Sequence, residues 1–258
     1  MTRRQIVELM LWSGGAAAQQ QLPADFPRQE ADIVRAVVGA SHFNFARVKE
    51  LVNARPSLAK ATWDWGFGDW ETALGAASHT GQRDTAFYLI DKGATPTIFS
   101  AAMLGQLPIV RAWATAIPGS HRAKGPHGLT LLHHARSGGP PAADVVAYLE
   151  QLGGADDQPA LAPLSQTDRT RLLGVYSFGP APADRFEVKW NARIAQLTIT
   201  RAQGGTPRNL LHLGAFLFYP SGAEAVRIRF NLPTPDSATA SAITIEDAAL
   251  RLTATRLT

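Results

Sequence analysis

The feature that most constrains the fold is the unit at positions 71–94, ETALGAASHTGQRDTAFYLIDKGA. Thr72 suits the N-cap of a short helix of small residues over 73–79, and Gly81 then turns the chain. A second helix with apolar bulk follows over 84–91 and ends at a glycine. Because a helix pair of this size cannot bury its own apolar faces, the unit requires copies of itself to pack against.

Three further segments repeat this order, with Asn44, Gly105 and Gly139 at their turns. The copy around Gly139 is the fullest, because it has the starting threonine, the apolar second helix and the closing glycine. The copy around Asn44 is the weakest. Helix pairs of this kind stack into an array in which each unit contacts its neighbours.

These units resemble ankyrin repeats, whose pattern is Thr-Pro-Leu-His-x-Ala, a turn glycine and a Leu-rich helix that ends in Gly-Ala. The resemblance covers about residues 30–156 and implies an array that binds another protein through its inner helices and projecting loops, called fingers. The turns lie 37, 24 and 34 residues apart, whereas regular ankyrin units repeat at about 33 residues. The two long intervals therefore predict two long fingers.

The first finger carries the sequence WDWGFGDWE, and aromatic residues on loops are typical anchors of binding surfaces. We assign its residues Trp63, Asp64, Trp65, Phe67 and Trp70 to a protein-binding surface. The alternative is a local hydrophobic cluster that seals the gap between uneven repeats, and the two roles can fall to different members. The glycines of this finger do not form a nucleotide-binding loop, because the third glycine of that motif is missing.

The second finger adds His121, Arg122 and Lys124 to the predicted protein-binding surface, and His79 completes it from the array. We expect Trp65, Phe67, His79 and Arg122 to lie on one side of the array. In this interpretation the partner is another protein, and the chain is a monomer.

Four histidines in and after the second finger invite a metal interpretation: His121, His127, His133 and His134. The resemblance gives His133 a structural hydrogen-bonding role, and the adjacent His133 and His134 point to different faces of a helix. We therefore predict no metal site and no cofactor.

After the array the composition shifts to Pro, Ala, Asp and Gln, and then alternating apolar and polar residues predict half-buried strands. The expected strands are 173–178, 186–190, 193–201, 215–219, 225–232, 242–245 and 250–255. Closely spaced strands separated by Gly and Pro form an antiparallel barrel or sandwich. This region also resembles the small accessory β-domains that follow many bacterial hydrolases and repeat proteins.

The predicted fold class is thus a two-domain protein, α then β: an ankyrin-like helical repeat array followed by an antiparallel β-barrel or sandwich. We place an export leader and linker at 1–27, the array at 28–156, a linker at 157–165 and the β-domain at 166–258.

The N-terminus supports two interpretations. Arg3 and Arg4 precede a short apolar stretch and the small residues 16–18, a pattern that resembles a twin-arginine export leader. Cleavage near Gln19 would then give a periplasmic protein. The alternative is an amphipathic helix over 5–12, which would leave the protein in the cytoplasm.

Composition excludes several function classes. The chain has no cysteine, which removes disulfides, thiolate metal sites and cysteine nucleophiles, and no apolar stretch long enough to cross a membrane as a helix. The net charge of +4 comes from scattered arginines in the last third of the chain, so nucleic acid is not the expected partner. The motifs of hydrolases and phosphate-binding loops are absent.

These exclusions favour a noncatalytic protein-protein interaction scaffold, and not an enzyme. The alternative is small-molecule binding, or weak hydrolase activity, in the interior of the β-barrel, with Tyr176, Phe218 or Trp190 at its mouth.

Overall fold

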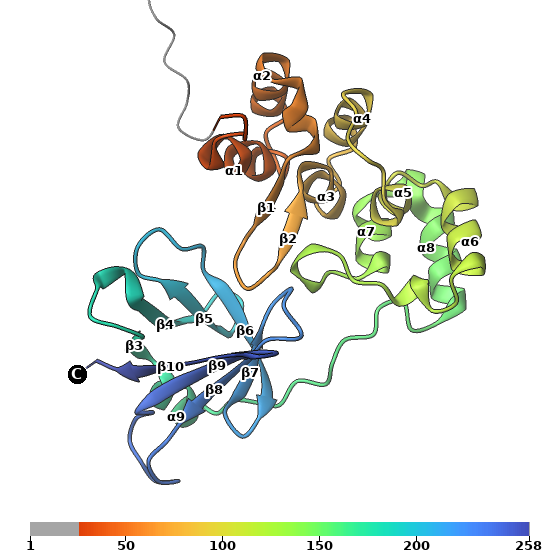
Figure 1. Cartoon of the computed structure of the whole chain (residues 1–258). Helices are drawn as coiled ribbons and strands as arrows, with labels where there is room; N and C mark the ends of the chain where they lie inside the picture. The colour runs from red at the N-terminus through yellow and green to blue at the C-terminus, as the bar shows by residue number, and fades with distance from the viewer. Residues whose placement is uncertain (1–25, 258) are drawn as a thin grey trace, which may run out of the picture.

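The computed structural model describes residues 26–257, in which a helical part is followed by a closed eight-stranded barrel (Figure 1). The export leader and its alternative, the helix over 5–12, fall outside the described residues. None of the helices in the described range is long and apolar enough to span a membrane.

The helical part consists of four consecutive helix pairs. They are α1 (Ala31–Ala40) with α2 (Phe45–Ala54), α3 (Ala73–His79) with α4 (Arg83–Asp91), α5 (Ile98–Met103) with α6 (Leu107–Ala116), and α7 (Leu131–Ser137) with α8 (Ala143–Leu152). The first helices α1, α3, α5 and α7 pack side by side in a row, while α2 packs against α4 and α6 against α8. In Figure 1, α2 and α4 lie on the side of this row away from the barrel. The four predicted helix-turn-helix segments are therefore helical, and each has its turn where the sequence indicated one.

The caps and turn glycines explain why these short helices begin and end where they do. The Thr72 hydroxyl accepts a hydrogen bond from the amide of Gly75 at 2.8 Å, which caps α3. Gly81 has a φ of +72°, and a Cβ atom there would lie 2.2 Å from the backbone oxygen of Ser137. Glycine at this turn thus permits both the left-handed backbone and the close approach of another unit.

The barrel has antiparallel strands in the order β10-β3-β4-β5-β6-β7-β8-β9, closed by pairing of β10 with β3. The strands are β3 (Gly174–Ser177), β4 (Arg185–Asn191), β5 (Gln196–Arg201), β6 (Arg208–Gly214), β7 (Leu217–Pro220), β8 (Arg227–Asn231), β9 (Ala242–Asp247) and β10 (Leu250–Arg256). A short helix, α9 (Gln166–Leu172), precedes them. Of the two predicted β architectures, the barrel is the one that forms.

One stretch of the barrel contradicts the strand predicted for it. The sequence predicted one strand over 215–219, whereas β6 and β7 flank a tight turn at Ala215 and Phe216. Both turn residues have positive φ, 48° and 55°. Asn or Gly usually occupies such hairpin positions, so an Ala-Phe turn leaves no turn signal in the sequence.

Aromatic side chains fill the barrel interior. Tyr176 and Phe218 each pack edge-on against Phe230, with ring centroids 5.8 and 5.4 Å apart. Tyr176 and Phe218 are both buried, and the Tyr176 hydroxyl donates to the backbone oxygen of Leu172. Trp190 is half-buried beneath the guanidinium of Arg169. The side chains proposed to surround a ligand in the barrel thus pack against the protein itself.

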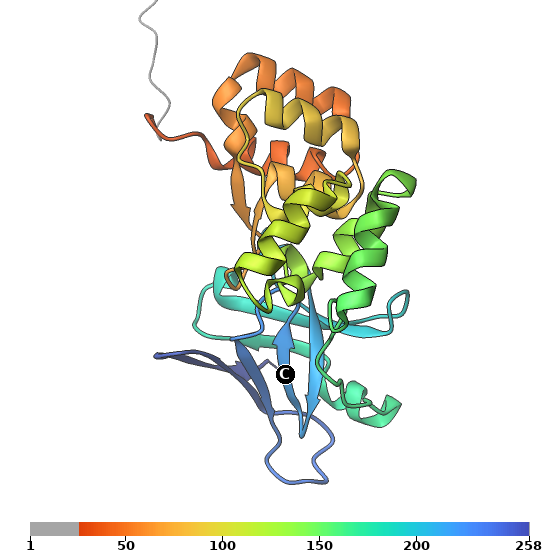
Figure 2. The same ribbon diagram turned by 90° about the vertical axis from the view of Figure 1, so that its right-hand side faces the viewer.

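The first finger, residues 62–72, is a β-hairpin of β1 (Thr62–Asp64) and β2 (Trp70–Thr72) that the sequence did not predict. The hairpin projects from the helical part towards the barrel, and both views show it between the two (Figures 1 and 2). At its tip, Phe67 packs against the barrel core. The finger thus joins the two halves of the molecule.

Candidate metal centre

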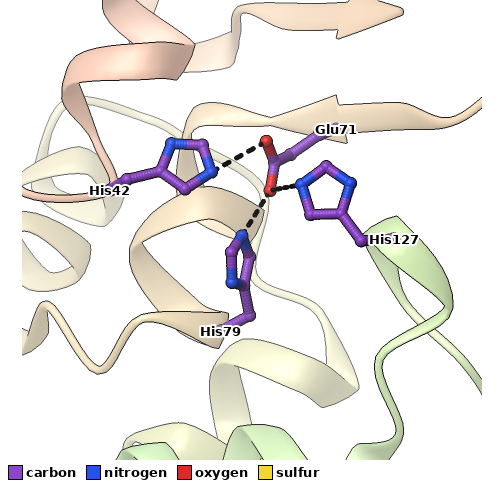
Figure 3. A group of neighbouring side chains, drawn as sticks. All are labelled: His42, Glu71, His79 and His127. Atoms are coloured by element: carbon purple, nitrogen blue, oxygen red, sulfur yellow. Dashed lines mark hydrogen bonds and ion pairs between the residues drawn. The ribbon is translucent and has the colours of Figure 1, made fainter. Parts of the chain in front are cut away.

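Four side chains with metal-binding groups converge beside the first finger: His42, Glu71, His79 and His127 (Figure 3). One ligand atom from each lies within 4.8 Å of all the others. His42 follows α1, Glu71 lies in β2, His79 ends α3, and His127 belongs to the short helical turn Pro126–Gly128 of the second finger. We call these four residues the histidine cluster.

Each of the three imidazoles presents its Nε2 atom to the carboxylate of Glu71. The Nε2 atom of His79 lies 2.8 Å from Oε1, that of His127 lies 3.5 Å from Oε1, and that of His42 lies 3.3 Å from Oε2. The ligands of a tetrahedral ion with bonds of about 2.0–2.1 Å are roughly 3.3 Å apart. The three contacts to Glu71 are therefore close to the ligand spacing of such an ion, and all four ligand atoms lie within 4.8 Å of one another.

The other ring nitrogen, Nδ1, is held by the protein in two of the histidines. Nδ1 of His42 faces the backbone oxygens of Val38 and Gly39 at 3.2 and 3.1 Å, and Nδ1 of His127 lies 2.6 Å from Oδ2 of Asp69. Because carbonyl and carboxylate oxygens only accept, Nδ1 must donate in both contacts. In the neutral rings the lone pair therefore sits on Nε2, the atom that faces the centre.

Glu71 is fixed and fully buried at the centre of the cluster. The indole N–H of Trp65 donates to its Oε2 atom at 2.6 Å, which leaves Oε1 directed at His79 and His127. Burial alone would raise the pKa of this carboxyl group, but hydrogen bonds from the three histidines hold the pKa far below its usual range. Glu71 is therefore a charged, oriented oxygen donor.

Asp69 connects the histidine cluster to the barrel. Its carboxylate accepts from the His127 ring and, at 2.8 Å, from the backbone amide of His127, and it forms a buried ion pair with Arg208 of β6. The side chain of Arg208 also donates to the backbone oxygen of Ser221. A Cβ atom on Gly222 would lie 2.4 Å from the Asp69 carboxylate, so glycine allows the barrel loop to close over it.

The electrostatics of the cluster differ from one histidine to the next. Burial opposes protonation of His127, yet Asp69 and Glu71 together raise its pKa to about 9. The Glu71 carboxylate likewise outweighs burial and raises the pKa of His42, whereas burial lowers the pKa of His79. Without an ion, the protonated His127 ring thus lies between the carboxylates of Asp69 and Glu71, which together stabilise its positive charge.

A cavity of about 370 Å³ gives access to the cluster. His42, His127 and Trp65 line one side, and barrel residues that include Arg208 and Asn209 line the other. The side chains of His42 and His127 are 19% and 23% exposed, while Glu71 is 0% exposed. The centre can therefore exchange an ion through its histidine side.

The residues predicted to bind a protein partner occupy several environments. Trp63 and Trp65 pack against the core of the helical part, Phe67 contacts the barrel, and Trp70 is 61% exposed. Asp64 accepts a hydrogen bond from the amide of Gly66, Lys124 lies near Glu224, and His121 and Arg122 form part of a short helical turn. His79 belongs to the histidine cluster. A protein-binding role for these residues stays a prediction.

Of the four histidines weighed as a metal motif in the sequence, His127 alone belongs to the cluster. His133 contacts the backbone oxygen of His79 at 3.1 Å, and Nδ1 of His134 contacts the hydroxyl of Ser78 at 2.9 Å. Both histidines therefore contact the end of α3 and hold it against α7.

His42 and Glu71 are not among the residues predicted from the sequence. A signal was present, because His42 precedes the turn residue Asn44 by two positions and His79 precedes Gly81 by two. Two successive units thus carry histidine at the same place, at the end of the first helix, where side chains from neighbouring units come together.

Comparison of the chain with models of known protein families gave no match, and comparison with curated proteins gave no significant match either.

Proposed function

We propose that the protein binds one divalent transition-metal ion, with Zn²⁺ the ion that fits best, through the histidine cluster. The ligands are the Nε2 atoms of His42, His79 and His127 and the Oε1 atom of Glu71. Three imidazoles and one carboxylate are a donor set suited to zinc and its neighbours, and poorly suited to Ca²⁺ or Mg²⁺, which prefer oxygen.

The observation that carries the proposal is the orientation of the rings. In His42 and His127 the protein holds Nδ1 with acceptors, so that Nε2 is the atom that faces the Glu71 carboxylate, to which it donates a proton in the absence of an ion. Acceptors facing one another repel unless a proton or a metal ion lies between them. The Asp69–His127 contact also has the form of the carboxylate–histidine pair that commonly orients a metal ligand.

Metal binding in this place would stabilise the junction of the two halves. His127 reaches the barrel through Asp69 and Arg208, and Glu71 belongs to the finger that touches the barrel. An ion held here would therefore tie α1, α3 and both fingers into one unit against the barrel.

Calorimetric titration of the chelator-treated full chain with Zn²⁺ tests the proposal. We expect one ion per chain and a stabilisation of about 2.7 kcal/mol at a free ion concentration of 100 times Kd. Co²⁺ in place of Zn²⁺ should give visible absorption of a four-coordinate site with nitrogen and oxygen ligands.

Two variants and one control identify the ligands. Glu71→Gln and His42→Gln should each weaken binding of the ion by about 100-fold or more, because each removes one of the four ligands. His133→Gln, whose ring lies outside the cluster, should bind as the wild type does. A folded wild-type chain that takes up no stoichiometric ion would refute the proposal. His42 is partly exposed, so its variant remains informative if Glu71→Gln fails to fold.

A second candidate function is the interaction scaffold, in which the helix pairs form an ankyrin-like array. The row of first helices with its two fingers supports it, and so does an apolar patch on α6, where Ile109, Trp113 and Ile117 are 50%, 43% and 52% exposed. Exposed apolar patches of this kind mark interaction sites. If Trp113→Ala leaves the melting temperature unchanged but removes a partner captured by the wild type, this function is supported. Equal capture by both chains contradicts it for this patch.

A further inference from the structure

A second cavity lies between α1, the first finger and the loop that joins β5 to β6. Its volume is about 320 Å³, near the lower limit for cavities that hold small organic ligands. It shares Trp65, Thr206 and Arg208 with the cavity beside the histidine cluster. Cavities at the junction of two structural units are common ligand sites.

The charge on the cavity wall is mainly positive. Arg35 of α1, Arg201 of β5 and Arg208 of β6 line it, against the single carboxylate of Asp64. Asp69 already neutralises Arg208 in a buried ion pair. Arg35 and Arg201 are exposed, so their guanidinium groups can reach an incoming anion, although Nε of Arg201 donates to the backbone oxygen of Ala183 at 2.8 Å.

The loop that joins β5 to β6 folds back against Arg201 at the end of β5. The amide of Gly205 donates to the Arg201 backbone oxygen, and a Cβ atom on Gly205 would lie 2.8 Å from the Arg201 backbone nitrogen. Gly204, with a φ of +75°, makes the preceding turn. Glycine at both positions lets the loop fold back on the end of β5 and form one side of the cavity.

Four aromatic side chains also line the cavity. Trp63, Trp65 and Phe67 come from the first finger and Phe186 from β4, and each of the four is only partly buried. Aromatic faces next to guanidinium groups suit a flat ring that carries a negative charge, because the ring packs on the aromatics while the charge pairs with arginine.

We propose that this cavity binds a small planar organic molecule with one anionic group, a carboxylate or a phosphate, held by Arg35 and Arg201 while its ring packs between the first finger and Phe186. The proposal is independent of the metal site. It gives the aromatic finger a role in ligand binding, with the finger supplying one wall and the barrel the other.

Calorimetric titration of the full chain in the presence of EDTA tests the proposal without interference from a metal-bound anion. The probes are benzoate and phenyl phosphate, with benzamide as the neutral ring and inorganic phosphate as the anion without a ring. We expect the tighter of the first two to bind about tenfold or more tightly than benzamide and inorganic phosphate, since only it satisfies both walls. A preference for benzoate assigns a carboxylate ligand, and a preference for phenyl phosphate assigns a phosphate ester.

Variants locate the binding. Arg35→Gln and Arg201→Gln should each weaken binding of the preferred probe about fivefold, because each removes one charge-assisted contact. Arg193→Gln, an exposed arginine that does not line the cavity, should leave binding unchanged. Binding of the preferred probe no tighter than that of benzamide or inorganic phosphate, unchanged binding in both cavity variants, or no saturable binding of any probe would each overturn the proposal. None of these outcomes alters the test of the metal site, which uses Zn²⁺ alone.

Discussion

The barrel core and the junction between the two halves are both buried, but they are built from opposite kinds of side chain. The core centres on Tyr176, Phe218 and Phe230. The junction contains Asp69, Glu71 and Arg208, buried to 2%, 0% and 6% exposure, with the histidines around them. Apolar packing needs only volume and shape, whereas a buried charge needs a specific partner. A substitution in the core should therefore destabilise by loss of packing, whereas one at the junction should destabilise by leaving a buried charge without its partner.

The largest effect is expected in the barrel core. Phe218→Ala should lower the free energy of unfolding by about 3–5 kcal/mol, because it removes a buried aromatic ring and leaves a cavity. Chemical denaturation measures this loss. Leu250→Ala, at an exposed position of β10, is the control and should change stability by less than about 1 kcal/mol. A small loss for Phe218→Ala would mean that the core is not the main source of barrel stability.

The next largest effect tests whether Asp69 and Arg208 stabilise the junction as an ion pair. Asp69→Asn should cost about 3 kcal/mol, because Arg208 then keeps a buried charge without a counter-ion. The double variant Asp69→Asn/Arg208→Met should lose less than the sum of the two single variants, since it removes both charges. Additive losses in this cycle would show that the two side chains contribute independently and would contradict the role of the ion pair.

His134 is expected to make stability depend on pH. Burial, together with His79 and His133, lowers the pKa of His134 to about 3, whereas an unfolded histidine titrates near 6.5. Between these values the unfolded chain binds a proton that the folded chain does not. Stability should therefore fall as the pH drops from about 6.5 towards 3, by at most about 1.4 kcal/mol per pH unit, with no contribution at higher pH.

Because other groups of the junction also titrate, the measurement compares slopes between chains. His134→Gln should flatten the dependence of unfolding free energy on pH relative to the wild type. Parallel curves for the wild type and His134→Gln would contradict a neutral, buried His134.

The smallest effect concerns the first finger. Trp70→Ala should change the free energy of unfolding by no more than about 0.5 kcal/mol, because this indole is 61% exposed. Trp65→Ala, which removes a hydrogen bond to buried Glu71, should cost more. Thermal melting of both variants measures the contrast. Equal losses would show that exposure does not separate structural from surface tryptophans in this finger.

Much of the fold follows from local sequence pattern. The caps and turn glycines around Gly81 predict short helices, and the alternation over 193–201 predicts a strand with Leu197 and Ile199 inward, where both are buried. These signals are local because they arise from neighbouring residues. The turn at Ala215 and Phe216 was missed because its positive φ values are imposed by the hairpin and not by residue type.

The candidate site could not be found in the same way. Its ligands come from positions 42, 71, 79 and 127, and none of these spacings matches a local metal motif. Packing of α1 against α3 brings His42 to His79, and the second finger then brings His127 to both. The four histidines that suggest a metal motif in the sequence are close in number, whereas the structure groups histidines that lie close to turns. Such grouping depends on tertiary packing that residue spacing does not encode.

The pairing of β10 with β3 has a consequence for the order of events during synthesis. Thr255 and Arg256 of β10 meet Ser177 and Tyr176 of β3. About 80 residues separate these partners, which a ribosome adds in roughly 4–16 s at 5–20 residues per second. The helix pairs can fold during this interval, while the first finger waits without the surface against which Phe67 and Asp69 pack. The histidine cluster is thus expected to be completed after translation of the last strand, so a nascent chain would acquire its metal late.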